Sequence, residues 1–88
     1  MYDVVIGMVT DLDKRRGIVR IQEGDRRYLN KEAVFLLSRQ HVTTRSEHEI
    51  RFGKKTEGRP PAMRDRIVLE VGFTNKLNVF RWGPIPSS

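Results

Sequence analysis

The clearest feature of the sequence is the alternation of apolar and polar positions over residues 65–73. Ile67, Leu69 and Val71 fall on one face, opposite charged residues such as Arg66. A period of two residues is typical of a β-strand, because successive side chains point to opposite faces. Less regular alternation predicts three further strands, at residues 4–10, 18–22 and 77–82.

The strand at residues 18–22 predicts a β-hairpin. Val19 and Ile21 share one face of this strand, and Arg20 lies on the other. An unpaired arginine is costly to bury, so we expect the face of Arg20 to contact water. The polar break at residues 23–25 contains Gly and Asp, which are typical of a tight turn. It predicts that the chain returns as a third strand over residues 26–30.

Residues 31–37 lose the alternation, and their apolar positions predict one or two helical turns at the end of a barrel. Residues 38–63 then form a long basic insertion. Plain loops of this length are rare in small domains, so we expect either a mobile loop or an extra hairpin. In the second case residues 48–52 form one arm. The core candidates of the insertion are Val42, Ile50 and Phe52.

Five short strands separated by turn residues, with little helix, predict a small all-β barrel. Gly7 interrupts the first strand, where a glycine indicates a bulge, a bend or a close approach of backbone. The chain of 88 residues is long enough for one small domain. We expect this domain to span residues 1–83, with residues 84–88 as a flexible tail.

The composition narrows the class of protein further. There is no cysteine, which excludes disulfides and thiolate zinc sites. The first residues lack the basic segment and long apolar run of a signal peptide, and no stretch approaches the length of a transmembrane helix. We therefore expect a cytoplasmic protein that does not contact membranes.

The charge of the chain indicates a polyanionic partner. The formal net charge is +6 and the sequence pI is about 10.3. A basic surface that neutralises phosphates releases counterions, which favours binding to nucleic acid. The alternative is that the charge serves solubility alone. Net charge by itself says nothing about fold.

Four segments of the chain follow a shared sequence pattern. Residues 7–21 align without a gap with G-x-V-K-W-F-N-x-x-K-G-F-G-F-I. Residues 27–34 follow V-F-V-H-x-S-A-I, residues 64–71 follow G-x-x-V-x-F-x-V without its glycine, and residues 76–79 follow K…A-x-N-V. In these segments the chain resembles the cold-shock domains, five-stranded OB-fold barrels that bind single-stranded nucleic acid. The resemblance implies such a barrel, with the long insertion between strands 3 and 4.

The positions that bind bases in the cold-shock family differ in this chain. In the family, bases stack on outward aromatic side chains, and such stacking contributes about 1–3 kcal/mol per base. Here the matching positions hold Asp11, Ile18 and Arg20, while Asn30 replaces a histidine and only Tyr28 keeps an aromatic ring. Arginine can partly substitute, because its planar guanidinium stacks on bases and pairs with phosphate. The resemblance therefore implies weaker binding, led by arginine.

These residues and their basic neighbours form the predicted site. We expect Tyr28 and Ile18 to contact bases, and the cationic side chains to contact phosphates. The predicted site consists of Lys14, Arg15, Arg16, Ile18, Arg20, Arg27, Tyr28, Asn30 and Lys31. Two plainer interpretations remain open: the charges can be a solvated hairpin rim, and Tyr28 can pack across strands on its neighbours.

No motif in the sequence predicts catalysis. The carboxylates near the predicted hairpin lie in turns, which lack the desolvated cleft of a paired acid and base. His41 and His48 stand without cysteine or a spaced set of carboxylates, so they give no metal-site pattern. There is also no nucleophile motif and no glycine-rich phosphate loop. We predict a protein that is not an enzyme and holds no cofactor or metal.

The function predicted from the sequence is binding of single-stranded nucleic acid with low sequence specificity. The ligand can be RNA or DNA, and RNA is the expected form. Such activity is that of an RNA chaperone or a regulator of transcription or translation. The alternative is a protein-interaction module on a barrel that has lost most base stacking. Its partner would be an acidic protein, such as a component of the transcription or translation machinery.

Overall fold

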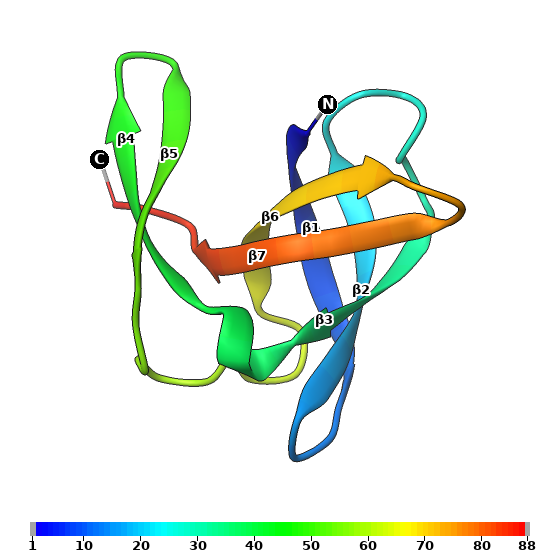
Figure 1. Cartoon of the computed structure of the whole chain (residues 1–88), viewed down its shortest axis with the longest axis horizontal. Helices are drawn as coiled ribbons and strands as arrows, with labels where there is room; N and C mark the ends of the chain where they lie inside the picture. Colours follow the sequence, from blue (N-terminus) through cyan, green and yellow to red (C-terminus); the bar gives the residue numbers. More distant parts are fainter. Residues whose placement is uncertain (1, 88) are drawn as a thin grey trace.

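Seven strands and one 3-10 turn make up residues 2–87, the part of the chain described by the computed structural model (Figure 1). The elements are β1 (Asp3–Leu12), β2 (Arg16–Glu23), β3 (Glu32–Leu36), η1 (Leu37–Arg39), β4 (His41–Ser46), β5 (Glu49–Lys55), β6 (Arg66–Phe73) and β7 (Leu77–Pro84). The prediction of an all-β fold is therefore confirmed.

Five of the strands form one antiparallel sheet with the order β3-β2-β1-β6-β7. Three consecutive strands lie side by side, and β6 returns by a long connection to pair with β1, which is the order of a Greek key. The sheet curls, so that β7 comes back toward β3 (Figure 1). Strands β3 and β7 do not pair, which leaves the barrel open between them. The indole of Trp82 donates a hydrogen bond to the backbone oxygen of Leu36 across this opening. The result is a half-barrel.

The core fills the concave face of the sheet, and the alternation along each strand explains which side chains enter it. Val19 and Ile21 point inward from β2, while Arg20 points outward, as the sequence predicted. The buried cluster consists of Val5, Val9, Val19, Ile21, Tyr28, Ala33, Phe35, Ile67, Leu69, Val71 and Trp82. The opposite, convex face of the sheet is called the outer face.

Gly7 has the close backbone approach that the sequence predicted. A Cβ atom at this position would lie 2.5 Å from Cγ2 of Val19 and 3.0 Å from the backbone oxygen of Arg20. The register of β1 against β2 also shifts between Ile6 and Gly7. A glycine is needed here because any side chain would enter space that the neighbouring strand already occupies.

The predicted third strand is wrong, and so is the helix predicted after it. Residues 26–30 form turns, and the third strand is β3, Glu32–Leu36. Within residues 2–87, helical geometry is limited to the single 3-10 turn η1. Ala33 and Phe35 point into the core, whereas Val34 and Leu36 point outward. Apolar residues therefore occupy both faces of β3, which hides the alternation in the sequence.

The insertion forms an extra hairpin, which was one of the two alternatives predicted for residues 38–63. Strands β4 and β5 pair with each other in a separate two-stranded sheet beside the outer face (Figure 1). The base of the hairpin docks on β7, where Thr43 donates a hydrogen bond to the backbone oxygen of Pro84. The ring of Phe52 lies 4.8 Å from the guanidinium of Arg81. Of the predicted core candidates of the insertion, Ile50 and Phe52 are half-buried and Val42 is exposed.

The last strand is longer than predicted. Strand β7 continues through Gly83 to Pro84, so residue 84 belongs to the sheet and not to a tail. Pro84 is tolerated because β7 is an edge strand, where one side of the backbone needs no ladder bond. In residues 2–87 no helix has both the length and the apolar character needed to cross a membrane.

Candidate nucleic-acid interface

Three consecutive cations lie at the turn between β1 and β2: Lys14 and Arg15 in the turn itself, and Arg16 as the first residue of β2. All three are exposed, and none makes an ion pair with another residue of the range 2–87. The turn is held by Asp13, whose backbone N–H donates to the oxygen of Arg16 and whose carboxylate accepts the N–H of Lys14. The carboxylate is thus engaged with the backbone, and the cationic side chains stay free for a ligand.

An apolar strip lies on the outer face of β2 and β3 beside this turn. Ile18 pairs with Val34, and two residues further along the ladder, on the same face, Leu36 pairs with Arg16. Val34 is 49% exposed and Leu36 is 42% exposed. We call these three apolar residues, Ile18, Val34 and Leu36, the outer strip. The sequence pointed to Ile18 but missed the two residues of β3, because that segment was expected to be helical.

Two hollows meet at the outer strip, and Ile18 and Val34 line both of them. The smaller hollow, of about 230 Å³, leads to the β1–β2 turn and includes Arg16 and the exposed Asp11. The larger, of about 570 Å³, leads to the β6–β7 turn and includes Lys76. A shallow track therefore runs from the basic β1–β2 turn, across the outer strip, to Lys76 in the β6–β7 turn.

Arg20 lies at the border of the outer strip, but its charge already has partners. Its guanidinium donates to the carboxylate of Glu32 at 3.0 Å and to the backbone oxygen of Asn30 at 2.8 Å. Both side chains of the ion pair are about half exposed, so the pair contributes less than about 1 kcal/mol. Such a pair can exchange for a phosphate at little cost.

The placement of Tyr28 on the water-exposed face is wrong. Tyr28 is 1% exposed, and its ring belongs to the core. Its hydroxyl donates a hydrogen bond of 2.7 Å to Asp3. This hydrogen bond, together with burial, raises the pKa of the Tyr28 hydroxyl above its ordinary value. Because residues 26–30 form turns, the position equivalent to an outward strand residue in the cold-shock pattern points inward here, and Tyr28 cannot contact a base.

Arg27 is held by two carboxylates. Its guanidinium donates to Asp3 at 3.0 Å and to Asp25 at 3.1 Å, and its backbone N–H donates to Asp25 at 2.9 Å. The backbone and side-chain hydrogen bonds from Arg27 lower the pKa of Asp25. The hydrogen bond with Asp25 in turn raises the pKa of Arg27. Arg27 therefore fastens the β2–β3 connection to the start of β1.

Asn30 and Lys31 also belong to the β2–β3 connection. Asn30 has a φ of 64°, in the left-handed region that asparagine tolerates better than most residues. Its backbone N–H donates to the oxygen of Ile21, and the N–H of Ile21 donates to the oxygen of Lys31. Asn30 thus closes the connection through its backbone, while the side chain of Lys31 is exposed.

The structure divides the predicted site into two groups at opposite ends of β2 (Figure 1). Lys14, Arg15, Arg16 and Ile18 come together at the outer strip and the β1–β2 turn. Arg27, Tyr28, Asn30 and Lys31 lie in the β2–β3 connection. Arg20 stands between the two groups.

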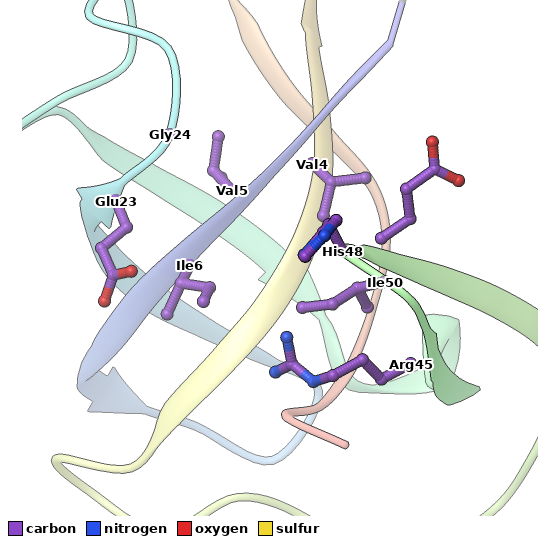
Figure 2. A pocket seen from close by; sticks show the side chains of 9 residues that line it. Val4, Val5, Ile6, Glu23, Gly24, Arg45, His48 and Ile50 are labelled. Atoms are coloured by element: carbon purple, nitrogen blue, oxygen red, sulfur yellow. The ribbon is translucent and has the colours of Figure 1, made fainter. Parts of the chain in front are cut away.

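A separate cleft of about 560 Å³ lies between the hairpin and β1. Figure 2 shows His48 and Ile50 of the hairpin close to Val4 of β1 in this cleft. Its two carboxylates are both engaged, Glu23 with Arg66 and Glu49 with Arg51. The cleft shows that the hairpin contacts the sheet at its base and stands away from it near its tip.

The two histidines lie in or beside the hairpin strands. Nδ1 of His41 is 2.9 Å from the backbone oxygen of Gly53, and His48 occupies the β4–β5 turn. Within residues 2–87 there is no group of three or more His, Cys, Asp or Glu side chains suited to a metal ion.

The electrostatic character of the whole surface is basic. Five arginines, namely Arg20, Arg27, Arg51, Arg66 and Arg81, make all the ion pairs found in residues 2–87. Twelve of the 17 Lys and Arg side chains therefore have no such partner there. A surface of this kind attracts polyanions over distances of about a Debye length.

Comparison of the chain with protein-family models, with curated proteins and with solved structures finds no match. Nothing in these comparisons identifies a cold-shock domain, so the case for function depends on the geometry described above.

Proposed function

We propose that this protein binds single-stranded nucleic acid, with RNA as the expected form, along the track across the outer face of β2 and β3. The observation that carries the proposal is the continuity of this track. It joins the β1–β2 turn, the outer strip and the β6–β7 turn. Partly open, five-stranded Greek-key barrels of the OB type bind oligonucleotides with the corresponding face and loops.

The strand order supports an OB-type barrel that is open between its third and fifth strands. The order β3-β2-β1-β6 is a Greek key, and β7 extends it on the side of β6. The hairpin β4–β5 is then the long insertion between the third and fourth strands of the barrel.

The chemistry of the track divides between charge and apolar contact. Lys14, Arg15 and Arg16 at one end, and Lys76 at the other, would neutralise phosphates and release counterions. The outer strip offers apolar contact to base faces but no aromatic ring. Because most of the affinity then comes from phosphate contacts, we expect low sequence specificity and steep salt dependence.

Fluorescence anisotropy with a labelled 12-residue oligouridylate, at two salt concentrations, tests the proposal. The informative variant is Arg15→Glu/Arg16→Glu in the β1–β2 turn. The matched control is Lys54→Glu/Lys55→Glu on the hairpin, which reverses the same number of cations. We expect the turn variant to lose about tenfold or more in affinity, and the control to lose clearly less.

Two results would contradict the proposal. Equal losses in the two variants would show that binding depends on net charge and not on the track. Absence of binding by the wild-type protein at low salt would overturn nucleic-acid binding and leave the protein-interaction alternative.

A further inference from the structure

Phe73 and Tyr28 form a parallel aromatic pair at the end of the half-barrel near the β2–β3 connection. Their ring centroids lie 5.2 Å apart and the ring planes differ by 10°. The two rings differ sharply in environment, since Tyr28 is buried whereas Phe73 is 50% exposed. The pair is therefore a stack with one member in the core and one open to solvent.

The inner ring of this stack is fixed in place. The hydroxyl of Tyr28 donates to Asp3, and Asp3 also accepts from Arg27. The guanidinium of Arg27 lies 5.3 Å from the centroid of the Tyr28 ring. Phe73 thus rests on a support with few degrees of freedom, and a flat ligand on its outer face would need little reordering of the protein.

The other exposed aromatic pair lacks this geometry. Tyr2 and Phe80 have centroids 4.4 Å apart, but their planes are inclined by 55°. A third ring placed on Tyr2 would not continue a stack, whereas a ring placed on Phe73 would continue the parallel arrangement. Among the aromatic pairs of residues 2–87, the Tyr28–Phe73 pair alone combines parallel rings with an exposed outer member.

Phe73 lies next to the end of the track, although it does not line either hollow. It is the last residue of β6 and pairs with Leu77, which lines the larger hollow together with Lys76. The charged side chains of the β2–β3 connection, the start of β1 and the β6–β7 turn include Asp3, Asp25, Arg26, Arg27, Lys31 and Lys76. Arg27, the cation that contacts the Tyr28 ring, is occupied by the two carboxylates and is not free for phosphate, whereas Arg26, Lys31 and Lys76 make no ion pair within residues 2–87. The exposed face of the Phe73 ring itself is apolar and suits a neutral planar ring.

We infer that the exposed face of Phe73 is a stacking site for one nucleobase of the bound strand. This inference rests on the proposed function and adds a base contact to it. Base stacking on aromatic side chains tolerates all four bases. The site would therefore raise the affinity for a strand that carries bases, without making the protein specific for a sequence.

A simpler role for Phe73 is to cover Tyr28, and this role makes a different prediction. A leucine at position 73 would still cover Tyr28, but it has no aromatic face to stack on a base. A tryptophan would cover Tyr28 and offer a larger face. The comparison of Phe73→Leu with Phe73→Trp therefore separates covering from stacking.

The experiment measures binding of the full chain to two labelled 12-residue strands, an oligouridylate and a strand of the same length with abasic sites throughout. For Phe73→Leu we expect about fivefold or greater loss of affinity for the oligouridylate. The affinity for the abasic strand and the salt dependence should stay unchanged. Phe73→Trp should bind the oligouridylate at least as tightly as the wild type, and Phe80→Leu, the control on the tilted pair, should leave the affinity for both strands near the wild-type values.

Each outcome decides a separate question. If the wild type binds at low salt but Phe73→Leu binds both strands as the wild type does, the stacking site is refuted and the proposed function stands. Equal losses for the two strands in Phe73→Leu refute it as well, because they indicate a structural effect. If the wild type binds neither strand, the proposed function fails and the stacking site fails with it. Urea unfolding of each variant shows whether the substitution changes the free energy of unfolding, as loss of the cover over Tyr28 would.

Discussion

The indole nitrogen of Trp82 donates a hydrogen bond of 2.9 Å to the backbone oxygen of Leu36. This bond joins β7 to the end of β3, the two strands that leave the half-barrel open. Trp82 is buried and its ring also packs edge-on against Phe35, with centroids 5.4 Å apart. One side chain thus supplies both core volume and the tie across the opening.

Replacing Trp82 with phenylalanine should destabilise the protein by about 1–3 kcal/mol, because it leaves a cavity and removes the partner of the Leu36 oxygen. Urea unfolding followed by circular dichroism measures this change. Phe80→Leu, a half-buried aromatic outside the core, is the control and should cost less. A loss below about 0.5 kcal/mol in Trp82→Phe would show that the hydrogen bond between β7 and β3 contributes little to the stability of the half-barrel.

Tyr28→Phe should lower stability at neutral pH by about 1–2 kcal/mol, through loss of the hydrogen bond to Asp3. Tyr2→Phe, on the surface, should change stability by less than about 0.5 kcal/mol. The hydrogen bond to Asp3 and burial raise the pKa of Tyr28 in the folded state, so its contribution is complete below about pH 10 and is lost at higher pH. The stability curves of wild type and Tyr28→Phe should therefore converge above pH 10; curves that stay parallel would contradict this account.

Gly83→Ala should loosen the hairpin from the sheet. A Cβ atom at position 83 would lie 2.5 Å from the backbone oxygen of His41 and 2.5 Å from Cγ2 of Thr43. We expect a loss of about 1–3 kcal/mol, together with faster amide hydrogen exchange in β4 and β5. Gly53→Ala is the matched control, since its Cβ would meet Val42 at an ordinary 3.6 Å. Equal effects in the two variants would mean that the hairpin does not dock through Gly83.

Val34→Thr tests the outer strip without changing the shape of the side chain. The substitution replaces a methyl group by a hydroxyl at an exposed position, so stability should change by less than about 0.5 kcal/mol. Reduced apolar contact with bases should weaken binding of the oligouridylate about threefold. Val42→Thr on β4, which is similarly exposed, should bind like the wild type. The outer strip would lose its assigned role if both variants bound equally well.

The sequence predicted the strands whose two faces differ in polarity. In β6, Ile67, Leu69 and Val71 face the core, and this strand was placed to within one residue at its start. Strand β3 was missed because Val34 and Leu36 make its outer face apolar as well. The two inward residues of β3, Ala33 and Phe35, differ in size but not in polarity from their outward neighbours, so they give no pattern that marks a strand.

The candidate site could be predicted only in part, because each assignment depended on whether the predicted strand that carries the residue exists. Arg16 and Ile18 were assigned to the site from a strand that exists, and the structure places them on the track. Tyr28 was assigned from a strand that does not exist, so its direction was wrong. Phe73 and Lys76 come near the site only through the pairing of β6 with β1 and the curl that brings β7 back to β3, which no local pattern in the sequence reveals.

The pairing of β1 with β6 has a consequence for how the chain folds. Asp3 lies opposite Val71, so the central strand of the sheet finds one of its two neighbours only near the end of the chain. Five of the twelve hydrophobic residues buried within residues 2–87 also come from β6 and β7, namely Ile67, Val68, Leu69, Val71 and Trp82. Contacts between such distant residues close large loops and slow folding. During synthesis the apolar face of β1 and β2 therefore stays uncovered until β6 and β7 have left the ribosome.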